Sequence, residues 1–443
     1  MSIPDTIIEW KAGILIVMAL LALGILSSPA AEAPAGTPDP LLFDDGTLVT
    51  NREQWLERRR PELLTLFHRE MYGQAPGRPP GMKFEVFEED TKALQGRATR
   101  RQIAVYFNGQ TNGPRMDVLL YLPNNMAQPV PTFLTLNFWG NHAVIADPAI
   151  RITQNWMESN RNSWVDLSGV TNGVATEACR GINARQWPIE TILERGYGFA
   201  TIYRGDIAPD KFDGFTNSLH ALYPELQGRG DNFTTIGAWA WGLSRAMDYL
   251  VTDPRVDAER VAVFGWSRLG KTALWAAATD ERFALAISHE SGAGGAKLFR
   301  HGVGETIERL NTVFPHWFCG NFRKYNGRDR EMPFDQHMVI SLIAPRPVYV
   351  ASAEEDLHAD PAGEFLSAQL ASPVFELFHN EGLPAKVPPL VGQPVFGRIG
   401  YHVRPGKHDV LPFDWQQYLT FADLHLKPRP TPEKRVGLQR IAP

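Results

Sequence analysis

The segment 260–278 joins an apolar run directly to an alanine-rich stretch through one glycine-flanked turn. The run reads Arg-Val-Ala-Val-Phe, the turn reads Gly-Trp-Ser-Arg-Leu-Gly-Lys-Thr, and the alanine-rich stretch extends to Ala278. A short apolar run bounded by such a turn predicts a buried strand, and the stretch after it predicts a helix. Buried strands that alternate with helices are typical of parallel sheets covered on both faces, so this segment favours an α/β fold.

The same strand-like pattern recurs along the chain. Helical stretches such as 237–251 separate the runs, which again indicates a mostly parallel central sheet with helices on both faces. Ligands in such sheets bind outside the carboxyl ends of the strands, so we expect a site in the loops after the runs. The further runs lie at 133–136, 199–202, 285–287, 348–350 and 395–399.

The N-terminal third of the chain has a different pattern. Residues 51–72 carry apolar side chains at broadly helical spacing, which predicts an amphipathic helix laid on the body. Strand-like runs at 84–87, 103–107 and 118–122 follow, separated by Gly and Asn turns. These runs predict an antiparallel edge of the sheet.

Two long segments, 140–186 and 207–235, have no clear period. Trp156, Trp164 and Trp187 lie in or beside the first of them. The chain has 38 Gly and 34 Pro, which indicates many turns and long excursions between regular elements. We therefore expect these two segments to be insertions that roof a cleft.

The charge balance argues against nucleic acid as a partner. The chain has 44 Lys plus Arg against 49 Asp plus Glu, a net charge of −5. Such a chain has no global basic field that would hold phosphates. We expect neither a nucleic acid partner nor, once the N-terminal signal is removed, a stable membrane partner, and we expect a monomer.

The N-terminus predicts export. Residues 13–31 are uncharged, and the small residues 28–33 suit a signal peptidase, so residues 1–33 are expected to be a signal peptide. An uncleaved membrane anchor is the alternative, because the stretch could just span a bilayer. Either way the protein would work outside the cytoplasm, as a periplasmic or extracellular protein. The Pro-rich stretch 34–50 is expected to be a linker, and residues 431–443 a C-terminal tail.

Export bears on the two cysteines, Cys179 and Cys319. In an oxidising compartment they could pair. The sequence leaves that pairing open, and neither cysteine has metal-ligand spacing.

The turn 265–272 supports two incompatible interpretations. As Gly-x-x-x-x-Gly-Lys-Thr it satisfies the P-loop pattern, with a strand before and a helix after. However, Trp266 and Arg268 are bulky choices for a loop whose backbone must wrap a phosphate. No apolar run ending in a convincing Walker-B aspartate follows. We therefore regard a P-loop NTPase as a rival and not as the main interpretation.

As Gly-x-Ser-x-x-Gly the same turn is a nucleophile elbow. A sharp strand-to-helix turn lifts the serine hydroxyl to the edge of the sheet, and the helix N-terminus faces the developing oxyanion. The second glycine of the usual pattern is displaced, because Leu269 occupies its place and Gly270 follows. An ordinary turn between a strand and a helix is the alternative. The choice between the two depends on whether the chain also offers an acid and a histidine that could act with Ser267.

An elbow serine requires an acid and then a histidine later in the chain. His408, in Gly-Lys-His-Asp, is the best placed of the 12 histidines, between the last strand and the helix expected at 413–424. His402 is expected inside or at the edge of that strand. Glu290 and Asp356 each follow a predicted strand, and either carboxylate could orient the imidazole. The sequence does not separate them.

These residues resemble a known family. Gly-Trp-Ser-Arg-Leu-Gly-Lys, the Ser-Gly-Ala-Gly-Gly after Glu290 and the final Gly-Lys-His-Asp are similar to the bacterial glucuronoyl esterases of carbohydrate esterase family 15. The likeness runs over 51–427. It implies an α/β-hydrolase fold with one catalytic domain, expected at 51–430. It also implies hydrolysis of the ester between (4-O-methyl)glucuronate on xylan and a lignin alcohol, without a metal or cofactor.

The resemblance also implies roles for individual residues. Ser267 is the nucleophile, His408 the general base and Glu290 the acid, with Asp356 able to share or replace that role. Arg268 fits an oxyanion donor, since its guanidinium beside the attacked carbonyl would stabilise negative charge. Substrate binding falls to Lys271, Glu305 and His358.

Three positions depart from the family pattern. Many fungal members carry cysteines where this chain has Trp266 and Asp409, so their disulfide is absent. His358 stands where members often have a tryptophan against the sugar, which puts the strength and pH dependence of sugar binding in question. Alternative functions are another carbohydrate esterase activity, such as acetyl-xylan deacetylation, and a non-catalytic carbohydrate-binding hydrolase fold.

Overall fold

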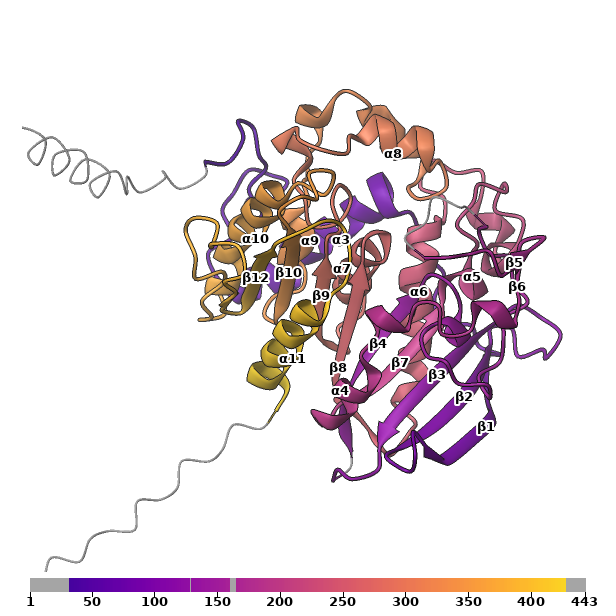
Figure 1. Cartoon of the computed structure of the whole chain (residues 1–443). Coiled ribbons are helices and arrows are strands. Elements are labelled where there is room, and N and C mark those ends of the chain that lie inside the picture. Colours follow the sequence, from indigo (N-terminus) through magenta and orange to yellow (C-terminus); the bar gives the residue numbers. More distant parts are fainter. Residues whose placement is uncertain (1–31, 128, 160–164, 428–443) are drawn as a thin grey trace, which may run out of the picture.

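The computed structural model describes residues 32–127, 129–159 and 165–427 (Figure 1). Its centre is a ten-stranded sheet with the spatial order β1-β2-β3-β7-β4-β8-β9-β10-β12-β11. The strands are β1 (Lys83–Ala93), β2 (Ala98–Tyr106), β3 (Arg115–Pro123), β4 (Val130–Asn137), β7 (Gly198–Tyr203), β8 (Val256–Trp266), β9 (Phe283–His289), β10 (Val348–Ala353), β11 (Val395–Phe396) and β12 (Ile399–Arg404).

The sheet is parallel from β7 to β12 and antiparallel at its two edges. β1, β2, β3 and β7 pair in antiparallel fashion, whereas β7, β4, β8, β9, β10 and β12 run parallel. The parallel strands β4, β7, β10 and β12 are buried along their whole length, which explains why their sequences read as near-continuous apolar runs. The predicted α/β-hydrolase sheet with an antiparallel edge is confirmed.

The run expected at 395–399 is corrected. Residues 395 and 396 form the short edge strand β11, which is antiparallel to β12, and the last parallel strand is β12 (Ile399–Arg404). A turn at Gly397 separates the two: a Cβ there would lie 2.2 Å from the carbonyl oxygen of Gly382. Apolar residues lie on both sides of this turn, so the hydrophobic pattern alone does not show where one strand ends and the next begins.

Helices cover both faces of the sheet (Figure 1). On one face α4 (Ile189–Glu194) and α11 (Pro412–Leu426) lie together, joined by the ion pair between Arg195 and Asp423. On the other face α6, α7, α9 and α10 pack side by side. The predicted helices around 237–251, 268–278 and 413–424 are therefore confirmed. The bounds of the second layer are α6 (Thr235–Leu250), α7 (Arg268–Thr279), α9 (His337–Ser341) and α10 (Pro361–Glu376).

The expected helix at 51–72 is present, with two π-helical turns. It runs as α2 (Arg52–Gln54), a π-helix (Trp55–Arg59), α3 (Arg60–Phe67) and a second π-helix (His68–Tyr72). Tyr72 is fully buried and its ring stacks on Trp275 of α7 with centroids 4.2 Å apart. The helix thus packs on the α7 layer.

Part of the stretch expected to be a linker belongs to the folded body. Phe43 and Val49 are buried, and Arg59 donates to the carbonyl oxygen of Pro40 at 3.2 Å. Apolar side chains within a proline-rich stretch are the reason that it packs. The expected signal peptide, apart from its last two residues, and the expected tail lie outside the described residues.

Both cysteines are buried and free, so the possible Cys179–Cys319 disulfide is not formed. Among the described residues no helix combines the length and the apolar character needed to cross a bilayer.

The two aperiodic segments contain short elements and irregular chain. They follow β4 and β7 at the carboxyl end of the sheet. Trp164 lies outside the described residues. The elements are 3-10 turns at Asn141–Ala143, Glu177–Cys179, Ala184–Gln186, Ser218–Leu222 and Pro224–Leu226, the helix α5 (Arg204–Ile207) and the hairpin of β5 (Val170–Thr171) and β6 (Val174–Ala175).

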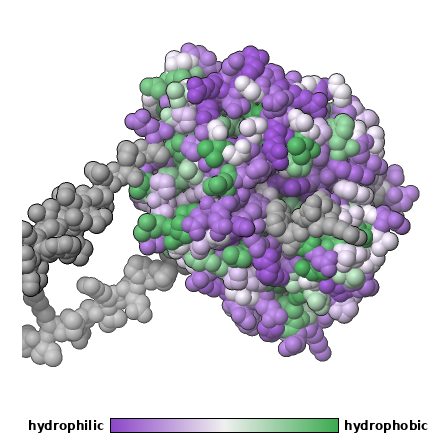
Figure 2. All heavy atoms as spheres, turned by 45° about the horizontal axis from the view of Figure 1, so that its top comes forward, coloured by the Kyte–Doolittle hydropathy of each residue, from purple (hydrophilic) through white to green (hydrophobic). Residues whose placement is uncertain are grey.

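A further excursion follows β9 and closes the same end of the molecule (Figure 1). It contains α8 (Ile307–Val313) and 3-10 turns at Phe299–His301, Gly320–Tyr325 and Asp329–Glu331. Hydrophilic side chains dominate the face turned forward in Figure 2, and apolar ones occur there only in small groups.

Candidate active site

Ser267 is the single residue between the end of β8 and the start of α7. Its backbone has φ 58° and ψ −128°, a region that residues with a side chain rarely adopt, and its N–H donates to the carbonyl oxygen of His289 at 2.9 Å. Such strain costs of order 1–3 kcal/mol and concentrates at functional sites. Because α7 begins at Arg268, the N–H groups at its N-terminus lie beside the serine.

The glycines on either side make this turn possible. A Cβ on Gly265 would lie 1.9 Å from the carbonyl oxygen of Leu269, and one on Gly270 would lie 2.9 Å from the Cβ of Ser291. The backbone after the serine therefore folds back onto β8 and packs against the loop after β9. This explains the displaced glycine: Gly270 is the residue that meets the neighbouring loop.

All the site residues predicted from the sequence line one cavity of about 320 Å³. They come from the loops that follow β8, β9, β10 and β12, which is the carboxyl end of the parallel sheet. The predicted residues in this lining are Ser267, Arg268, Lys271, Glu290, Glu305, Asp356, His358 and His408.

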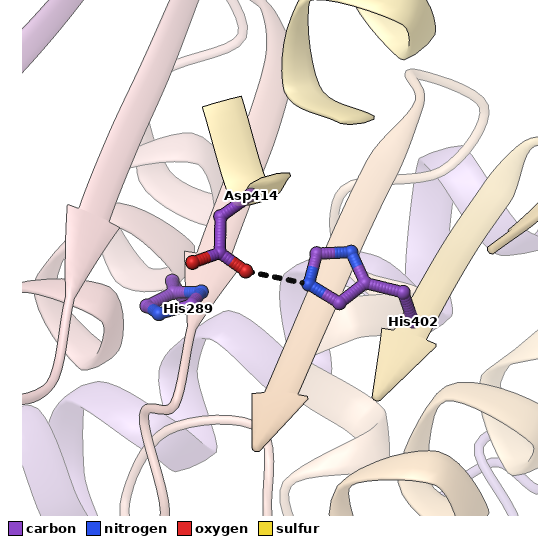
Figure 3. Close-up of side chains that lie close together, drawn as sticks. All are labelled: His289, His402 and Asp414. Carbon is purple, nitrogen blue, oxygen red and sulfur yellow. Dashed lines mark hydrogen bonds and ion pairs between the residues drawn. The ribbon is translucent and has the colours of Figure 1, made fainter. Parts of the chain in front are cut away.

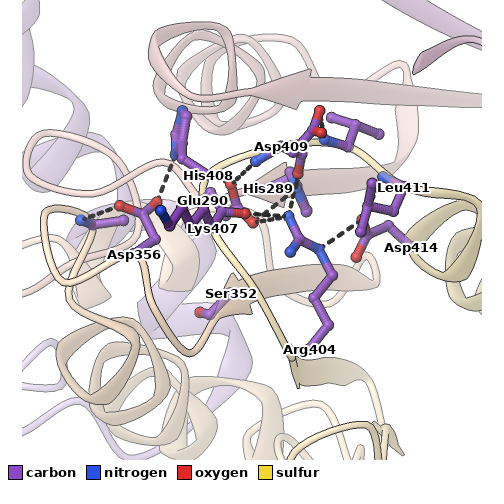
Figure 4. Close-up of polar contacts among 12 residues, drawn as sticks. His289, Glu290, Ser352, Asp356, Arg404, Lys407, His408, Asp409, Leu411 and Asp414 are labelled. Atoms are coloured by element: carbon purple, nitrogen blue, oxygen red, sulfur yellow. Dashed lines mark hydrogen bonds and ion pairs between the residues drawn. The ribbon is translucent and has the colours of Figure 1, made fainter. Parts of the chain in front are cut away.

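His408 contacts both candidate acids. Its Nδ1 lies 2.5 Å from Oδ2 of Asp356 and 3.1 Å from Oε2 of Glu290 (Figure 4). The ring of Trp266 lies against the imidazole, with centroids 5.1 Å apart. Burial would raise the pKa of Asp356, yet the hydrogen bond and the charge of His408 hold that pKa below its usual value. Asp356 is thus ionised and paired with the imidazole.

Glu290 has a second, permanent cation as its partner. Its Oε1 accepts from Arg404 at 2.6 Å, and its Oε2 accepts from the backbone N–H of Asp409 at 2.9 Å. Glu290 and Arg404 are both almost completely buried, so each compensates the other's charge. This leaves Asp356 as the carboxylate whose cationic partner would be His408 itself.

Arg268 is held over aromatic rings at the mouth of the cavity. Its guanidinium lies 4.8 Å from the ring centroid of Trp317, and its Nη1 donates to Oδ2 of Asp210 at 2.5 Å. Asp210 is buried and also accepts from Nε1 of Trp317 at 2.8 Å. Burial lowers the pKa of Arg268. Sequence analysis missed Asp210, because it lies in an aperiodic segment with no motif around it.

Lys271 is buried beneath the cavity. Its Nζ donates to the carbonyl oxygens of Ser291 at 2.7 Å and Ala293 at 2.6 Å, and it lies 3.4 Å from Oε2 of Glu305. Oε1 of Glu305 lies 3.7 Å from Nε2 of the largely exposed His358. Two donors of Lys271 are thus spent on backbone carbonyls, which is not the arrangement of a P-loop lysine. Lys271 instead fixes Glu305 and the loop after β9.

Glu364 of α10 is a buried acid that sequence analysis also missed. Its Oε1 accepts from the backbone N–H groups of Ser291 at 2.8 Å and Gly292 at 2.9 Å, and its Oε2 accepts from Oγ of Ser352 at 2.7 Å. Burial raises the pKa of Glu364 to about 8. The available signal was a carboxylate among small and apolar neighbours, in Ala-Gly-Glu-Phe-Leu.

A second buried cluster contains His289, His402 and Asp414 (Figure 3). Nε2 of His402 lies 2.9 Å from Oδ1 of Asp414, and Nδ1 of His402 lies 2.9 Å from the hydroxyl of Tyr349. The other oxygen of Asp414 accepts from Nε of Arg404 at 3.0 Å. The spacing alone would suit a metal ion, but these atoms already have partners. The cluster is therefore a hydrogen-bonded support beneath Glu290.

The chain is similar to known esterases. Residues 189–378 match the family model for glucuronyl esterases of fungi. The chain is 47% identical over 401 residues to a protein named carbohydrate esterase MZ0003 from an unknown prokaryotic organism, an alignment that covers 89% of this chain and 91% of the relative.

Solved structures agree. The structure of a promiscuous esterase of carbohydrate esterase family 15 from a marine bacterial metagenome superposes with a TM-score of 0.82 at 46% identity, and covers 90% of this chain and 98% of its own. A glucuronoyl esterase from Solibacter usitatus gives a TM-score of 0.83 at 44% identity, and covers 90% and 100%.

Proposed function

The chain belongs to carbohydrate esterase family 15 and is a carboxylic ester hydrolase, a glucuronoyl esterase, and we propose that it cleaves the ester that joins (4-O-methyl)glucuronate on xylan to an alcohol of lignin. The observation that carries the proposal is the cavity itself. Ser267 in a strained elbow, His408 and two carboxylates that contact its Nδ1 line one pocket.

In the first step Ser267 attacks the uronoyl carbonyl while His408 takes the proton of its hydroxyl. The C–O bond to the alcohol then breaks, and the alcohol leaves with the proton from His408. The negative charge on the carbonyl oxygen exists only in the transition state and its intermediate. The N–H groups at the start of α7 and the guanidinium of Arg268 are the donors available for it.

In the second step His408 removes a proton from water, and the hydroxide attacks the acyl-enzyme. Ser267 regains its proton, and glucuronate is released. Asp356 stabilises the imidazolium in both steps, since its Oδ2 lies 2.5 Å from Nδ1 of His408, whereas the charge of Glu290 is also compensated by Arg404. Glu290 shares that role and also holds the backbone of Asp409.

Recognition of the sugar falls to the floor of the cavity. Glu305 is held by Lys271 and presents its carboxylate beside His358. Carboxylates and cations placed in this way suit the hydroxyls of a pyranose. We assign Lys271, Glu305 and His358 to substrate binding.

The expected location of the protein follows from the same proposal. A substrate in plant cell walls requires an enzyme outside the cytoplasm, in agreement with the signal peptide expected at 1–33. The catalytic unit would be the single domain expected at 51–430 together with the packed residues 40–49, acting as a monomer.

A broader esterase activity is a second candidate. The observation in its favour is that the family 15 relative from the marine metagenome is described as promiscuous, at 46% identity to this chain. Acetylated xylose tests this alternative directly.

The test is hydrolysis of benzyl glucuronate by the wild type and by Ser267→Ala, monitored as released acid. We expect turnover by the wild type and none by the variant. A wild type that cleaves acetylated xylose but not benzyl glucuronate would overturn the proposal.

A further inference from the structure

A second cavity, of about 620 Å³, shares a wall with the catalytic machinery. The segment 205–211 serves both places: Asp210 holds Arg268, whereas Pro209 and Lys211 line the second cavity. The rest of its wall comes from the turn before β3, from residues 151–156 and from Asn217.

Two carboxylates form the polar floor of this cavity. Asp206 is buried, and its Oδ1 accepts from Oγ1 of Thr153 at 2.9 Å and from Nδ2 of Asn155 at 2.8 Å. Its Oδ2 accepts from the backbone N–H of Asp117 at 3.2 Å. This network ties the floor to the loop at 151–156.

The cations of the cavity are already paired. Oδ2 of Asp117 lies 3.2 Å from a guanidinium nitrogen of Arg115 and 3.2 Å from one of Arg151. Lys211 has its Nζ 4.8 Å from the ring centroid of Trp156. Each of these three cations therefore already contacts a group of the protein, a carboxylate for the two arginines and an aromatic ring for Lys211.

Asp117 is partly protonated near neutral pH, so the two acids can offer a donor as well as acceptors. Burial and the charge of Asp206 raise the pKa of Asp117 to about 7. A carboxyl pair that retains a proton can donate to one hydroxyl and accept from another. Together with the amides of Asn155 and Asn217 it matches the alternating donors and acceptors of a sugar.

Trp156 adds an apolar surface to this polar lining. Its ring is only partly buried, and its backbone carbonyl is anchored by the hydroxyl of Tyr203 at 2.7 Å. Aromatic faces with nearby polar groups bind the C–H face of a ring while the hydroxyls are hydrogen-bonded.

The cavity opens at the same end of the sheet as the catalytic pocket. Asp206 follows β7, and Asp117 lies in β3 next to Val118, which pairs with Ile202 near the end of β7. β7 and β8 are separated by β4 alone, so the ends of these two strands lie roughly 10 Å apart across the sheet at the usual strand spacing. One polymer chain could reach both.

We propose that this cavity is a second carbohydrate subsite, which takes neutral xylose units of the xylan main chain beyond the unit that bears the glucuronate. The inference rests on the proposed function for its choice of sugar. A lignin fragment is the less suitable occupant, because its aromatic rings offer few hydroxyl groups to a lining of carboxyls, guanidinium groups and amides.

The experiment measures binding of xylohexaose, which carries no uronate, by calorimetry. The variants are Trp156→Ala and Arg151→Ala, whose side chain is 43% exposed and therefore tolerant of replacement. Phe212→Ala is the matched control, since Phe212 is an exposed aromatic next to Lys211 that does not line the cavity. Benzyl glucuronate turnover is measured for every variant.

We expect the Kd for xylohexaose to rise about tenfold in Trp156→Ala, the upper end of one aromatic contact, and to stay unchanged in Phe212→Ala. The KM for a glucuronoxylan ester should rise in parallel, while benzyl glucuronate turnover keeps the wild-type rate. Absence of xylohexaose binding by the wild type, or equal Kd values in all folded variants, would overturn the subsite. So would binding of a lignin model dimer that Trp156→Ala abolishes.

The outcome is separable from the proposed function. If the wild type does not hydrolyse benzyl glucuronate, the esterase proposal is contradicted. Xylohexaose binding still tests separately whether the second cavity is a carbohydrate subsite. Normal turnover without xylohexaose binding contradicts the subsite alone.

Discussion

Arg404 binds the backbone on both sides of His408. One guanidinium nitrogen donates to the carbonyl oxygens of Lys407 at 2.9 Å and Asp409 at 2.5 Å, and the same nitrogen donates to Glu290. Because Arg404 is the last residue of β12, the end of the sheet holds the loop that carries the histidine (Figure 4). The position of His408 thus depends on a buried cation that does not line the pocket.

Replacement of Arg404 by Lys should lower kcat with little change in KM. Lysine retains the charge but lacks the fork that binds Glu290 and Asp414 at once. Misplacing a reacting group by about 1 Å can cost about 100-fold in rate. Steady-state kinetics of Arg404→Lys and of Arg195→Lys, a surface control, test this; equal kcat values would refute the positioning role.

Removing the charge of Arg404 should also destabilise the protein. Arg404→Met removes the guanidinium that contacts both buried carboxylates, Glu290 and Asp414, which should cost about 3–5 kcal/mol in the free energy of unfolding. The double variant Arg404→Met/Glu290→Gln should recover part of this loss. Denaturant unfolding measures both, and a double variant less stable than the single one would contradict the pairing.

The two acids should show strong coupling. Asp356→Asn removes the carboxylate nearer to Nδ1 of His408, and Glu290→Gln removes the one that also supports the loop. Each single variant thus retains one carboxylate at Nδ1 of His408. We expect the double variant to lose far more kcat than the two single losses combined. Losses that simply add would refute sharing of the imidazolium.

His289 should make stability fall at alkaline pH. Burial disfavours its charge, but the charges of Glu290 and Asp414 prevail and raise its pKa to about 9. The raised pKa means that the folded protein binds the proton more tightly than the unfolded chain, whose pKa is about 6.5. This stabilisation is complete below about pH 6.5 and is lost as pH rises through 9.

The expected slope is about 1.4 kcal/mol per pH unit between those values. Unfolding free energies from pH 6 to 9.5 should show it in the wild type and in His379→Asn, which alters an exposed histidine. The slope should be shallower in His289→Gln, and three parallel curves would contradict the assignment.

Gly265→Ala should disable the elbow. The added Cβ would lie 1.9 Å from the carbonyl oxygen of Leu269, so β8 and α7 must move apart. We expect a loss of about 3 kcal/mol in stability, together with loss of turnover. Gly77→Ala, where a Cβ meets nothing within 4 Å, is the control. Wild-type stability and activity in Gly265→Ala would show that the turn tolerates a side chain.

Much of the fold and of the pocket could be predicted because the signals are local. Strand, turn and helix around Ser267 are consecutive in sequence, and the residues of the pocket follow the ends of parallel strands, which meet at one edge. The predicted position of the last parallel strand, 395–399, is wrong by a few residues. The turn at Gly397 interrupts the run, but apolar residues lie on both sides of it. The packing of the proline-rich stretch at Pro40 to Val49 was missed for a similar reason.

The sequence by itself determined the α/β order of elements, the elbow at Ser267 and the residues that line the catalytic pocket, because each depends on short-range pattern. Only the tertiary structure separated Glu290 from Asp356, since the difference lies in Arg404, which is 114 residues from Glu290 along the chain. Only the tertiary structure placed Asp210 beside Arg268 and brought Asp206 and Asp117 together in the second cavity. Buried charges are distinguished by which partner reaches them, and that depends on how distant segments fold together.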